Sequence, residues 1–437
     1  MHPDPPTHYI EHIIYTALCR YLGKKLGADP LLSNVNFRRF WFSSALNGFG
    51  AQISGLALPL CAVLLLHATP AQMGALVALQ ALPFALLSLP AGVFLDRNRK
   101  LPVIICSELM SGLALASVAL AYWFGALSMP WLYVVGFIIG TGFVLGGGAE
   151  QIFLTQLIGR DRLIDAHAKF ATTDSAARLI GPGIAGILVQ LLTAPVAVLA
   201  TACGYLASVL NLRLMAVAEA RPAASDKHPL REIRDGLAFV WRQPLLRALA
   251  WGAGVWHLLY YGSAALSILF ATRELGMTPG TLGLAQTLGG LGVLASSQLV
   301  KPLTRRYGPG VTMLIGMAST TVTFMLMPAI PAALWGSAQA SAVAYGVLVF
   351  FFDCGVTLFF IPYMAMRQKV TPDAYLGRMI STMRFLTVAT APLGALAAGA
   401  IAEHFSVRTG LACIAVCSLA LTVAMVLAAP IRCCEAP

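Results

Sequence analysis

The sequence predicts an all-α membrane protein whose twelve spanning helices form two similar six-helix bundles. Three observations lead to this fold class. Charged residues make up 11% of the 437 residues and hydrophobic residues 58%, whereas about 25% of an ordinary soluble domain is charged. Twelve segments are apolar over about 20 residues, the length that crosses a bilayer. Features of the first half of the chain recur about 210 positions later in the second half.

This composition excludes several classes of protein. So few charges could not cover the surface of a soluble globule of this size, which excludes a cytosolic enzyme. Disorder is excluded because it requires low hydrophobicity together with high net charge. The nine cysteines are scattered, without the spacing of a metal site. We therefore expect neither a metal nor another cofactor.

The sequence pattern of residues 1–36, which precede the first span, predicts a cytoplasmic amphipathic segment. They hold no basic start followed by an apolar core, so no signal peptide is expected. Apolar residues recur there at helical spacing, with basic residues opposite them. A short helix of this kind lies on the membrane surface. The apolar stripe consists of Ile10, Ile13, Ile14, Ala17, Leu18, Tyr21 and Leu22.

Twelve spans follow, separated by turn-forming or charged residues. They are helices rather than barrel strands, because the segments are too long and too uniformly apolar for strands. The first bundle covers 37–218 and the second 245–431, joined by a linker helix at 219–244 and followed by a cytoplasmic tail at 432–437. The expected spans are 41–66, 71–95, 101–124, 131–156, 170–192, 195–217, 246–271, 280–301, 309–328, 340–365, 379–401 and 407–430.

The distribution of basic residues orients these spans. Lysine and arginine gather on the connections of one face, whereas the opposite face holds only Arg273 and Arg408. By the positive-inside rule the basic face is cytoplasmic. The chain is therefore expected in the cytoplasmic membrane with both termini inside. The net charge of +11 is then explained by the orientation of the spans in the membrane, and we expect no nucleic-acid partner.

The linker and the flanking halves show two further patterns. Leu230, Ile233, Leu237, Val240 and Trp241 fall on one helical face, which predicts an amphipathic helix lying on the surface. The halves repeat one another, because several features of the first half have counterparts about 210 positions later. Repeated bundles of this kind are typical of secondary transporters with a substrate site at their interface. The paired features are Arg39 with Arg247, Trp41 with Trp251, Arg97 with Arg305, and Pro182 with Pro392.

Charged residues inside spans cost several kcal/mol each and therefore need a reason. Asp174 and Arg178 stand one helical turn apart in the fifth span and are expected to face each other. Arg384 in the eleventh span could pair with Glu150 or Asp174 across the two halves, which would hold one conformation closed.

Asp353 and His257 are the deepest titratable groups, and Glu108 and Glu150 lie nearer the cytoplasmic side. A carboxyl group held away from water can bind and release a proton near neutral pH, and histidine titrates there in any case. These four residues are the candidates for proton coupling. Each could instead be a hydrogen-bonded structural group.

Uncharged polar and aromatic residues in the spans could contact a ligand. The candidates are Asn47, Gln52, Trp256, Tyr260 and Tyr261. An aromatic cavity with few polar groups suits an amphipathic cargo. The alternative is that most of these side chains face lipid.

Two motifs resemble those of the major facilitator superfamily. Residues 92–100 read GVFLDRNRK, similar to that superfamily's GxxxDRxGRR signature but one residue shorter after Asp96 and Arg97. Residues 178–186 read RLIGPGIAG, similar to the GPxxGG signature of drug/proton antiporters through Gly181, Pro182 and Gly186, with Ala185 replacing one glycine. The resemblance covers residues 37–430 and points to enterobactin exporters and macrolide efflux proteins.

The resemblance implies a major facilitator fold and export in exchange for protons. It implies that spans one, four, seven and ten line the cavity, and that a gate closes its cytoplasmic side. The gate residues it implies are Asp96, Arg97, Asp174, Arg178 and Arg384. Ala51 stands where relatives often place an aspartate, so coupling would have to use another carboxylate.

The sequence therefore predicts a transporter and not an enzyme. It would export a small amphipathic molecule, a drug or siderophore, by alternating access, as a monomer in contact with membrane lipids. A lysolipid transporter of the same fold is the alternative. A membrane-embedded enzyme is disfavoured because no HExxH or GxSxG motif occurs in the chain.

Overall fold

The computed structural model describes residues 31–159, 162–217, 219, 229–372 and 375–428. The predicted amphipathic segment up to residue 30 and the tail at 432–437 lie outside the described residues. All regular elements of the described chain are helices. The first half comprises α2 (Val35–Leu64), α3 (Pro70–Arg97), α4 (Lys100–Trp123), α5 (Met129–Ile158), α6 (Leu163–Leu192) and α7 (Ala194–Arg213).

The second half starts after the linker helix α8 (Pro229–Arg242). It comprises α9 (Pro244–Leu269), α10 (Pro279–Leu326), α11 (Ala338–Lys369), α12 (Leu376–Val388), α13 (Ala391–His404) and α14 (Val407–Leu427). A π-helical turn, Phe270–Glu274, extends α9, and a short 3₁₀ turn, Met327–Ala329, follows α10.

Eleven helical stretches in the described chain are long and apolar enough to span a membrane, and one of them accounts for two crossings. That stretch, Pro279–Ala329, has 51 residues, which at about 1.5 Å per residue is more than twice the bilayer core. Gly308 has a φ of 81° and breaks the helix there, a conformation that glycine adopts at little cost. The predicted count of twelve spans is thereby confirmed.

Proline has different effects at the two positions that the repeat pairs. Pro182 lies inside the continuous α6. Pro392 stands in the first turn of α13, directly after the break that divides the eleventh span into α12 and α13. Because proline has no amide hydrogen, it cannot continue a preceding helix without loss of a hydrogen bond. The two halves therefore share their helix order but differ in where a span is broken.

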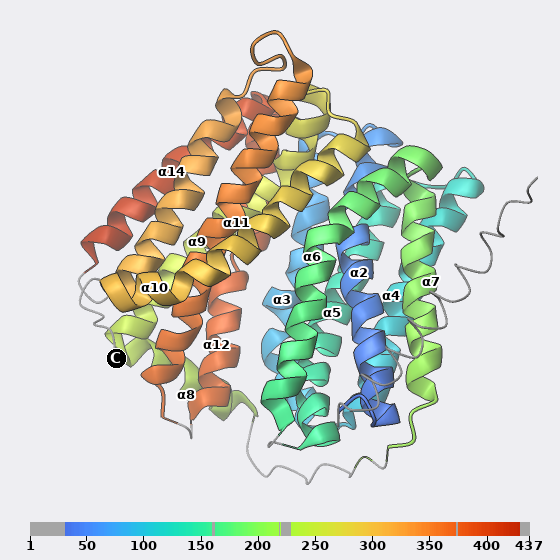
Figure 1. Cartoon of the computed structure of the whole chain (residues 1–437), viewed down its shortest axis with the longest axis vertical. Coiled ribbons are helices and arrows are strands. Elements are labelled where there is room, and N and C mark those ends of the chain that lie inside the picture. The colour runs from blue at the N-terminus through green and yellow to red at the C-terminus, as the bar shows by residue number, and fades with distance from the viewer. Residues whose placement is uncertain (1–30, 160–161, 218, 220–228, 373–374, 429–437) are drawn as a thin grey trace, which may run out of the picture.

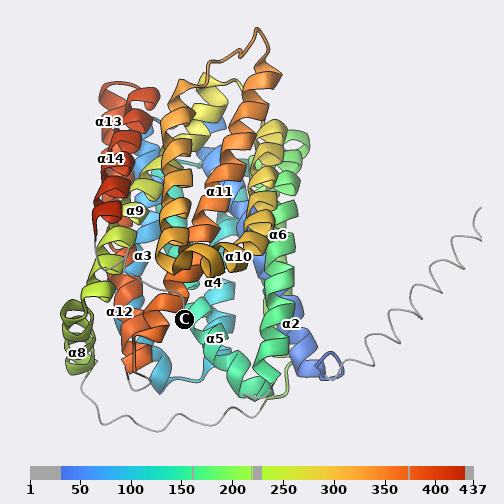
Figure 2. The same ribbon diagram turned by 60° about the vertical axis from the view of Figure 1, so that its left-hand side comes forward.

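The two bundles come together at one end of the molecule and diverge toward the other (Figure 1). We call the diverging end, which carries α8 and residues 97–100 and 369–372, the basic end. The opposite end, with residues 65–69, 192–194, 275–278 and 404–406, is the far end. The linker helix packs against α12 (Figure 2), where Gly236 lies against the Thr382 side chain. The predicted surface helix is thus docked on the second bundle.

The predicted apolar face of the linker is only partly correct. Val240 is buried, at 1% exposure, but Trp241 is 70% exposed and lies beside Arg247. The side chains of neighbouring residues on a helix point about 100° apart, so Val240 can be buried while Trp241 stays exposed. The side chains of Leu230 and Ile233 lie outside the described residues.

Two close helix pairs join the bundles at the far end. In one, α3 meets α13, and a Cβ on Gly399 would lie 3.0 Å from the Cα of Gly74. In the other, α6 meets α10, and a Cβ on Gly283 would lie 2.9 Å from the Cα of Gly186. Residues without side chains let backbones approach this closely in membranes. Each half therefore contributes one glycine to each contact.

Four hydrogen bonds, made by the side chains of Gln190, Glu403 and Arg273, accompany these glycines, and we call them the far-end latch. Gln190 Oε1 of α6 accepts hydrogen bonds from Gly280 N at 2.9 Å and Thr278 Oγ1 at 3.1 Å, at the start of α10. Glu403 Oε2 of α13 accepts from Ala71 N at 3.1 Å, at the start of α3. Arg273 Nη2 donates to Ala68 O at 2.8 Å. Side-chain oxygens thus satisfy free amides at the helix N-termini of the opposite half.

Arg408 holds the far end of the second bundle together. Its guanidinium donates to Glu274 Oε2 at 3.0 Å and to the carbonyls of Pro328 and Ile330 at 2.6 and 2.8 Å. Arg408→Ala leaves all three acceptors without this donor, so we expect a loss on the order of 2 kcal/mol and a lower melting temperature in a thermal unfolding assay. Arg306→Ala, whose side chain is exposed beside Tyr307, is the control. Equal melting temperatures for the two variants would contradict this assignment.

Candidate functional site

A cavity of about 430 Å³ lies between the two bundles. Helices α2, α3 and α6 line it from the first half, and α9, α10 and α11 from the second. The resemblance implied that spans one, four, seven and ten would line it, and this is wrong for span four: α5 contributes no lining residue. Gly136 and Gly140 of α5 pack directly on Gln80 of α3, which places α3 between α5 and the cavity.

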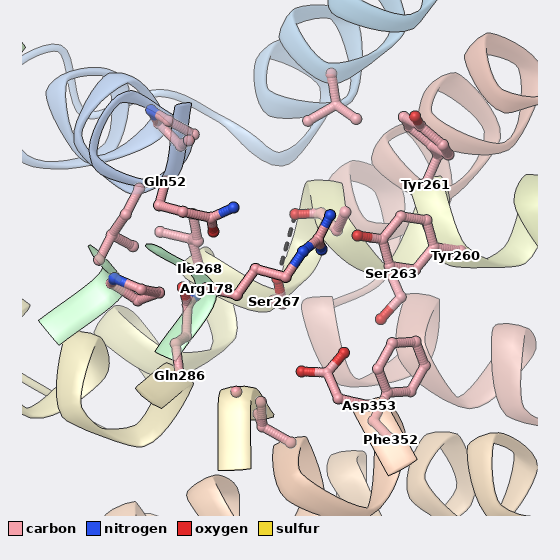
Figure 3. Close-up of a pocket in the computed structure, with 18 of the residues that line it drawn as sticks. Gln52, Arg178, Tyr260, Tyr261, Ser263, Ser267, Ile268, Gln286, Phe352 and Asp353 are labelled. Carbon is pink, nitrogen blue, oxygen red and sulfur yellow. Dashed lines mark hydrogen bonds between the residues drawn. The ribbon is translucent and has the colours of Figure 1, made fainter. Parts of the chain in front are cut away.

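One charged group from each half lines the cavity. Arg178 extends from α6 toward Tyr260 of α9, and Asp353 enters from α11 (Figure 3). The Nε of Arg178 donates to Asp174 Oδ2 at 2.9 Å, so the expected pairing of these residues within α6 is observed. Arg178 also interacts electrostatically with Asp353. The cavity therefore holds a cation that already has a partner and a carboxyl group without a hydrogen-bond donor among the described residues.

The position of Asp353 depends on a glycine in the neighbouring helix. A Cβ at Gly289 of α10 would overlap Asp353 Oδ2. The absence of a side chain at Gly289 therefore leaves the space that this carboxyl group occupies.

Aromatic rings form the wall of the cavity on the second half. The rings of Trp256, Tyr260 and Phe352 are nearly parallel and each contacts the other two, with centroid separations of 5.2, 5.9 and 6.2 Å. Trp256 is itself only 4% exposed and lies behind Tyr260. Gln52, Gln80 and Gln286 supply amide groups around the same cavity. This combination of aromatic faces and neutral hydrogen-bonding groups can hold an amphipathic molecule.

The structure separates the four candidates for proton coupling. Asp353 lines the cavity, whereas Glu108, Glu150 and His257 do not. The ring of His257 packs beside Trp256, and its Nδ1 lies 2.7 Å from Ala253 O within the same helix. Of the predicted polar and aromatic residues, Gln52, Tyr260 and Tyr261 line the cavity. Asn47 instead donates to Glu108 inside the first bundle.

The residues of the implied cytoplasmic gate do not meet in this conformation. Asp96 and Arg97 are exposed at the end of α3. Arg384 of α12 forms no ion pair with Glu150 or Asp174 among the described residues; it lies 5.2 Å from the ring centroid of Phe84 in α3. This cation–π contact joins the two halves through one side chain on each.

The antiporter-like motif lies on the face of α6 that contacts its neighbours. A Cβ on Gly181 would lie 2.5 Å from the Cβ of Gln52 in α2, so this glycine permits close packing within the first half. Pro182 lines the cavity. Gly186 forms the contact with Gly283 described above. The motif therefore sets both the wall of the cavity and the junction of the two bundles.

Several residues of this site were not found from the sequence. Gly283, Gly289 and Gly290 were not singled out, although glycines recur densely in 280–292 and would have indicated a packed helix face. Gln190 was considered only as a polar group that could orient a ligand, and Glu403 carried no signal, because a single polar residue at a helix end is common. Their role depends on which helix start lies opposite, which the chain alone does not state.

Comparison with known proteins agrees with this architecture. Residues 27–437 match the protein family described as transmembrane secretion effector. The multidrug efflux pump Tap of Mycolicibacterium fortuitum is 28% identical over 382 residues, covering 83% of this chain and 88% of the pump. The enterobactin exporter EntS of Citrobacter koseri is 24% identical over 372 residues, covering 81% of this chain and 82% of the exporter.

Two solved structures show the same fold. The nucleoside transporter NupG has a TM-score of 0.71 at 13% identity, covering 90% of this chain and 99% of that one. A bacterial homologue of the iron transporter ferroportin, in its inward-facing state, has a TM-score of 0.69 at 17% identity, covering 92% and 99%. At these identities the likeness concerns the fold alone.

Proposed function

The chain belongs to the transmembrane secretion effectors of the major facilitator superfamily, and on this premise we propose that it exports a small amphipathic molecule in exchange for protons. The observation that carries the proposal is the cavity between the bundles, which takes one charged group from each half. A relative movement of the bundles changes the distance between these charges. Substrate binding and movement are thereby linked.

The contacts between the bundles support alternating access. At the far end two glycine contacts and the latch hold the halves together. At the basic end Asp96 and Arg97 are exposed and the bundles diverge (Figure 1). The positive-inside rule assigns the basic end to the cytoplasm. We take this conformation as the inward-facing, loading state, from which export requires the latch to open and the gate residues to meet.

Asp353 is the residue to which we assign coupling in the cavity. It is the only carboxyl group among the lining residues in the described chain. A proton arriving from outside neutralises it and weakens its interaction with a bound substrate and with Arg178. Release of substrate outward and of the proton inward then follow as alternating steps.

The cargo that the cavity fits is a small molecule. Its volume of about 430 Å³ lies within the range of about 300–1,000 Å³ that holds drug-sized ligands. The multidrug pump and the siderophore exporter among the relatives support a cargo with aromatic and polar parts. The stacked rings and the three glutamines would contact those parts.

Reconstituted vesicles test this function directly. The chain is placed in proteoliposomes with ethidium, tetracycline and enterobactin as separate probes, and a proton gradient is imposed. We expect the gradient to drive accumulation of at least one probe, and addition of that probe to dissipate the gradient. Equal transport with and without the gradient would overturn proton exchange, and movement of none of the probes would overturn the assigned cargo class.

A further inference from the structure

A polar cluster lies inside the first bundle, away from the cavity. Glu108 of α4 is 5% exposed and Ser208 of α7 is fully buried. Asn47 Nδ2 of α2 lies 2.5 Å from Glu108 Oε1, and the Ser208 hydroxyl faces the same carboxyl group. None of these residues lines the cavity. Three helices therefore meet at one buried carboxyl group.

Three atoms of this cluster have no hydrogen-bond partner. They are Glu108 Oε2, Asn47 Oδ1 and Ser208 Oγ. A buried polar atom left in this way is unfavourable, because it has lost its hydrogen bonds to water without replacement. The ion pairs of the described chain do not include Glu108. An ionised Glu108 would thus be a buried charge with only two neutral donors, the Asn47 amide and the Ser208 hydroxyl, and no cation paired with it, which is unfavourable.

One added proton removes the buried charge and gives the cluster a further donor. A protonated carboxyl group has a donor as well as acceptors, and Asn47 Oδ1 and Ser208 Oγ are both able to accept from it. The Asn47 amide lies 2.5 Å from Glu108 Oε1, within reach of such a bond. The amide of an asparagine can be turned to place its oxygen there. When the neutral carboxyl group donates to Asn47 Oδ1, the Ser208 hydroxyl can donate to its other oxygen, and no charge is left buried.

We propose that Glu108 is a proton-binding site of the first bundle, held by Asn47 and Ser208 and separate from the substrate cavity. Its part in transport rests on the proposed proton exchange, whereas binding of the proton does not.

The neighbouring groups suit such a site. Glu150 of α5 and Tyr205 of α7 interact electrostatically with Glu108; Asn47 and Ser208 are uncharged, and no cation is paired with it in the described chain. A second carboxyl group nearby further disfavours a charge on Glu108. Glu150 is partly exposed and so is the more accessible of the two carboxyl groups.

The helix α2 connects this site to the cavity. Asn47 and Gln52 lie on α2 about 7.5 Å apart along its axis, and Gln52 lines the cavity. Gly181 of α6 packs against Gln52. A change in the bonding of Asn47 is therefore transmitted along one rigid element to the wall of the cavity and to α6.

Infrared spectroscopy of the full-length protein in lipid nanodiscs tests the proposal. A neutral buried carboxylic acid gives a C=O stretching band that ionised carboxylates lack. We expect this band at neutral pH in the wild type, its loss in Glu108→Gln, and its retention in Asp353→Asn. Asn47→Ala and Ser208→Ala are expected to shift the band, since each removes a hydrogen-bond partner. Ser111→Ala, a buried residue of the same helix, is the matched control and leaves it unchanged.

Two results would overturn the proposal. One is a band that persists unchanged in Glu108→Gln, and the other is a band that Na⁺ removes at constant pH, which would mark a cation site. Should the vesicles show no proton exchange while the band behaves as expected, the proposed function fails and the proton site stands. Should the vesicles exchange protons while Glu108→Gln keeps the band, the proposed function stands and the proton site at Glu108 fails.

Discussion

Replacing Gly283 with leucine is expected to reduce export to background. Gly283 of α10 faces Gly186 of α6, and a Cβ there would lie 2.9 Å from the Gly186 Cα, a backbone atom that cannot move aside alone. Overpacking of this kind costs about 1–3 kcal/mol or more, which changes a two-state equilibrium about 5- to 150-fold. The far end can then no longer close, and the loading state is depopulated. Probe accumulation in the reconstituted vesicles measures the effect.

Gly204→Leu is the control for this substitution. Gly204 lies in the middle of α7, and a Cβ there would meet no atom within 4 Å, so the same added volume meets no backbone. We expect normal expression, melting temperature and export. Gly186→Leu is expected to behave like Gly283→Leu, because the two glycines form one contact. Full export by Gly283→Leu would contradict the assigned far-end closure.

Asp353→Asn is expected to lower gradient-driven accumulation at least about tenfold, within the range of about 5- to 150-fold that is typical of coupling between sites. An amide occupies the same space but does not take up a proton, so the gradient has no group in the cavity on which to act. Exchange of labelled for unlabelled probe needs no net proton movement and is expected to remain. The ratio of driven accumulation to exchange is the measured quantity.

Two further variants are compared with Asp353→Asn. Gly289→Ala, which places a Cβ where Asp353 Oδ2 lies, is expected to lower driven accumulation in the same direction without removing the carboxyl group. Ser263→Ala, another change in the cavity lining, is expected to have little effect. If Asp353→Asn kept wild-type coupling, Asp353 would not be the group that binds the coupled proton in the cavity.

The spans could be predicted because each is a local property of the chain. A stretch of about 20 apolar residues crosses a bilayer whatever surrounds it, so even the two crossings merged in α10 were separated at the residues around Gly308. The Asp174–Arg178 pair was likewise local, one turn apart on one helix.

The cavity could be predicted only in part, because it depends on which helices face one another. Asp353 and Tyr260 were found as costly or unusual residues in spans, and both line the cavity. Glu150 was placed on a cavity-lining span by resemblance, but α5, which carries it, contributes no residue to the lining. The partners of Asn47, Gln190 and Glu403 lie far away in sequence, and no periodicity within one segment reports them.

The central claim is that the two ends open in turn, and distances between spin labels test it most directly. In a cysteine-free background that retains transport, one label pair replaces the exposed Ser128 and Trp335 at the far end and another replaces Gln156 and Lys369 at the basic end. Changing the pH in nanodiscs is predicted to change the two distances in opposite senses, so that one end lengthens as the other shortens. Distances that stay fixed, or that lengthen together, would contradict the account.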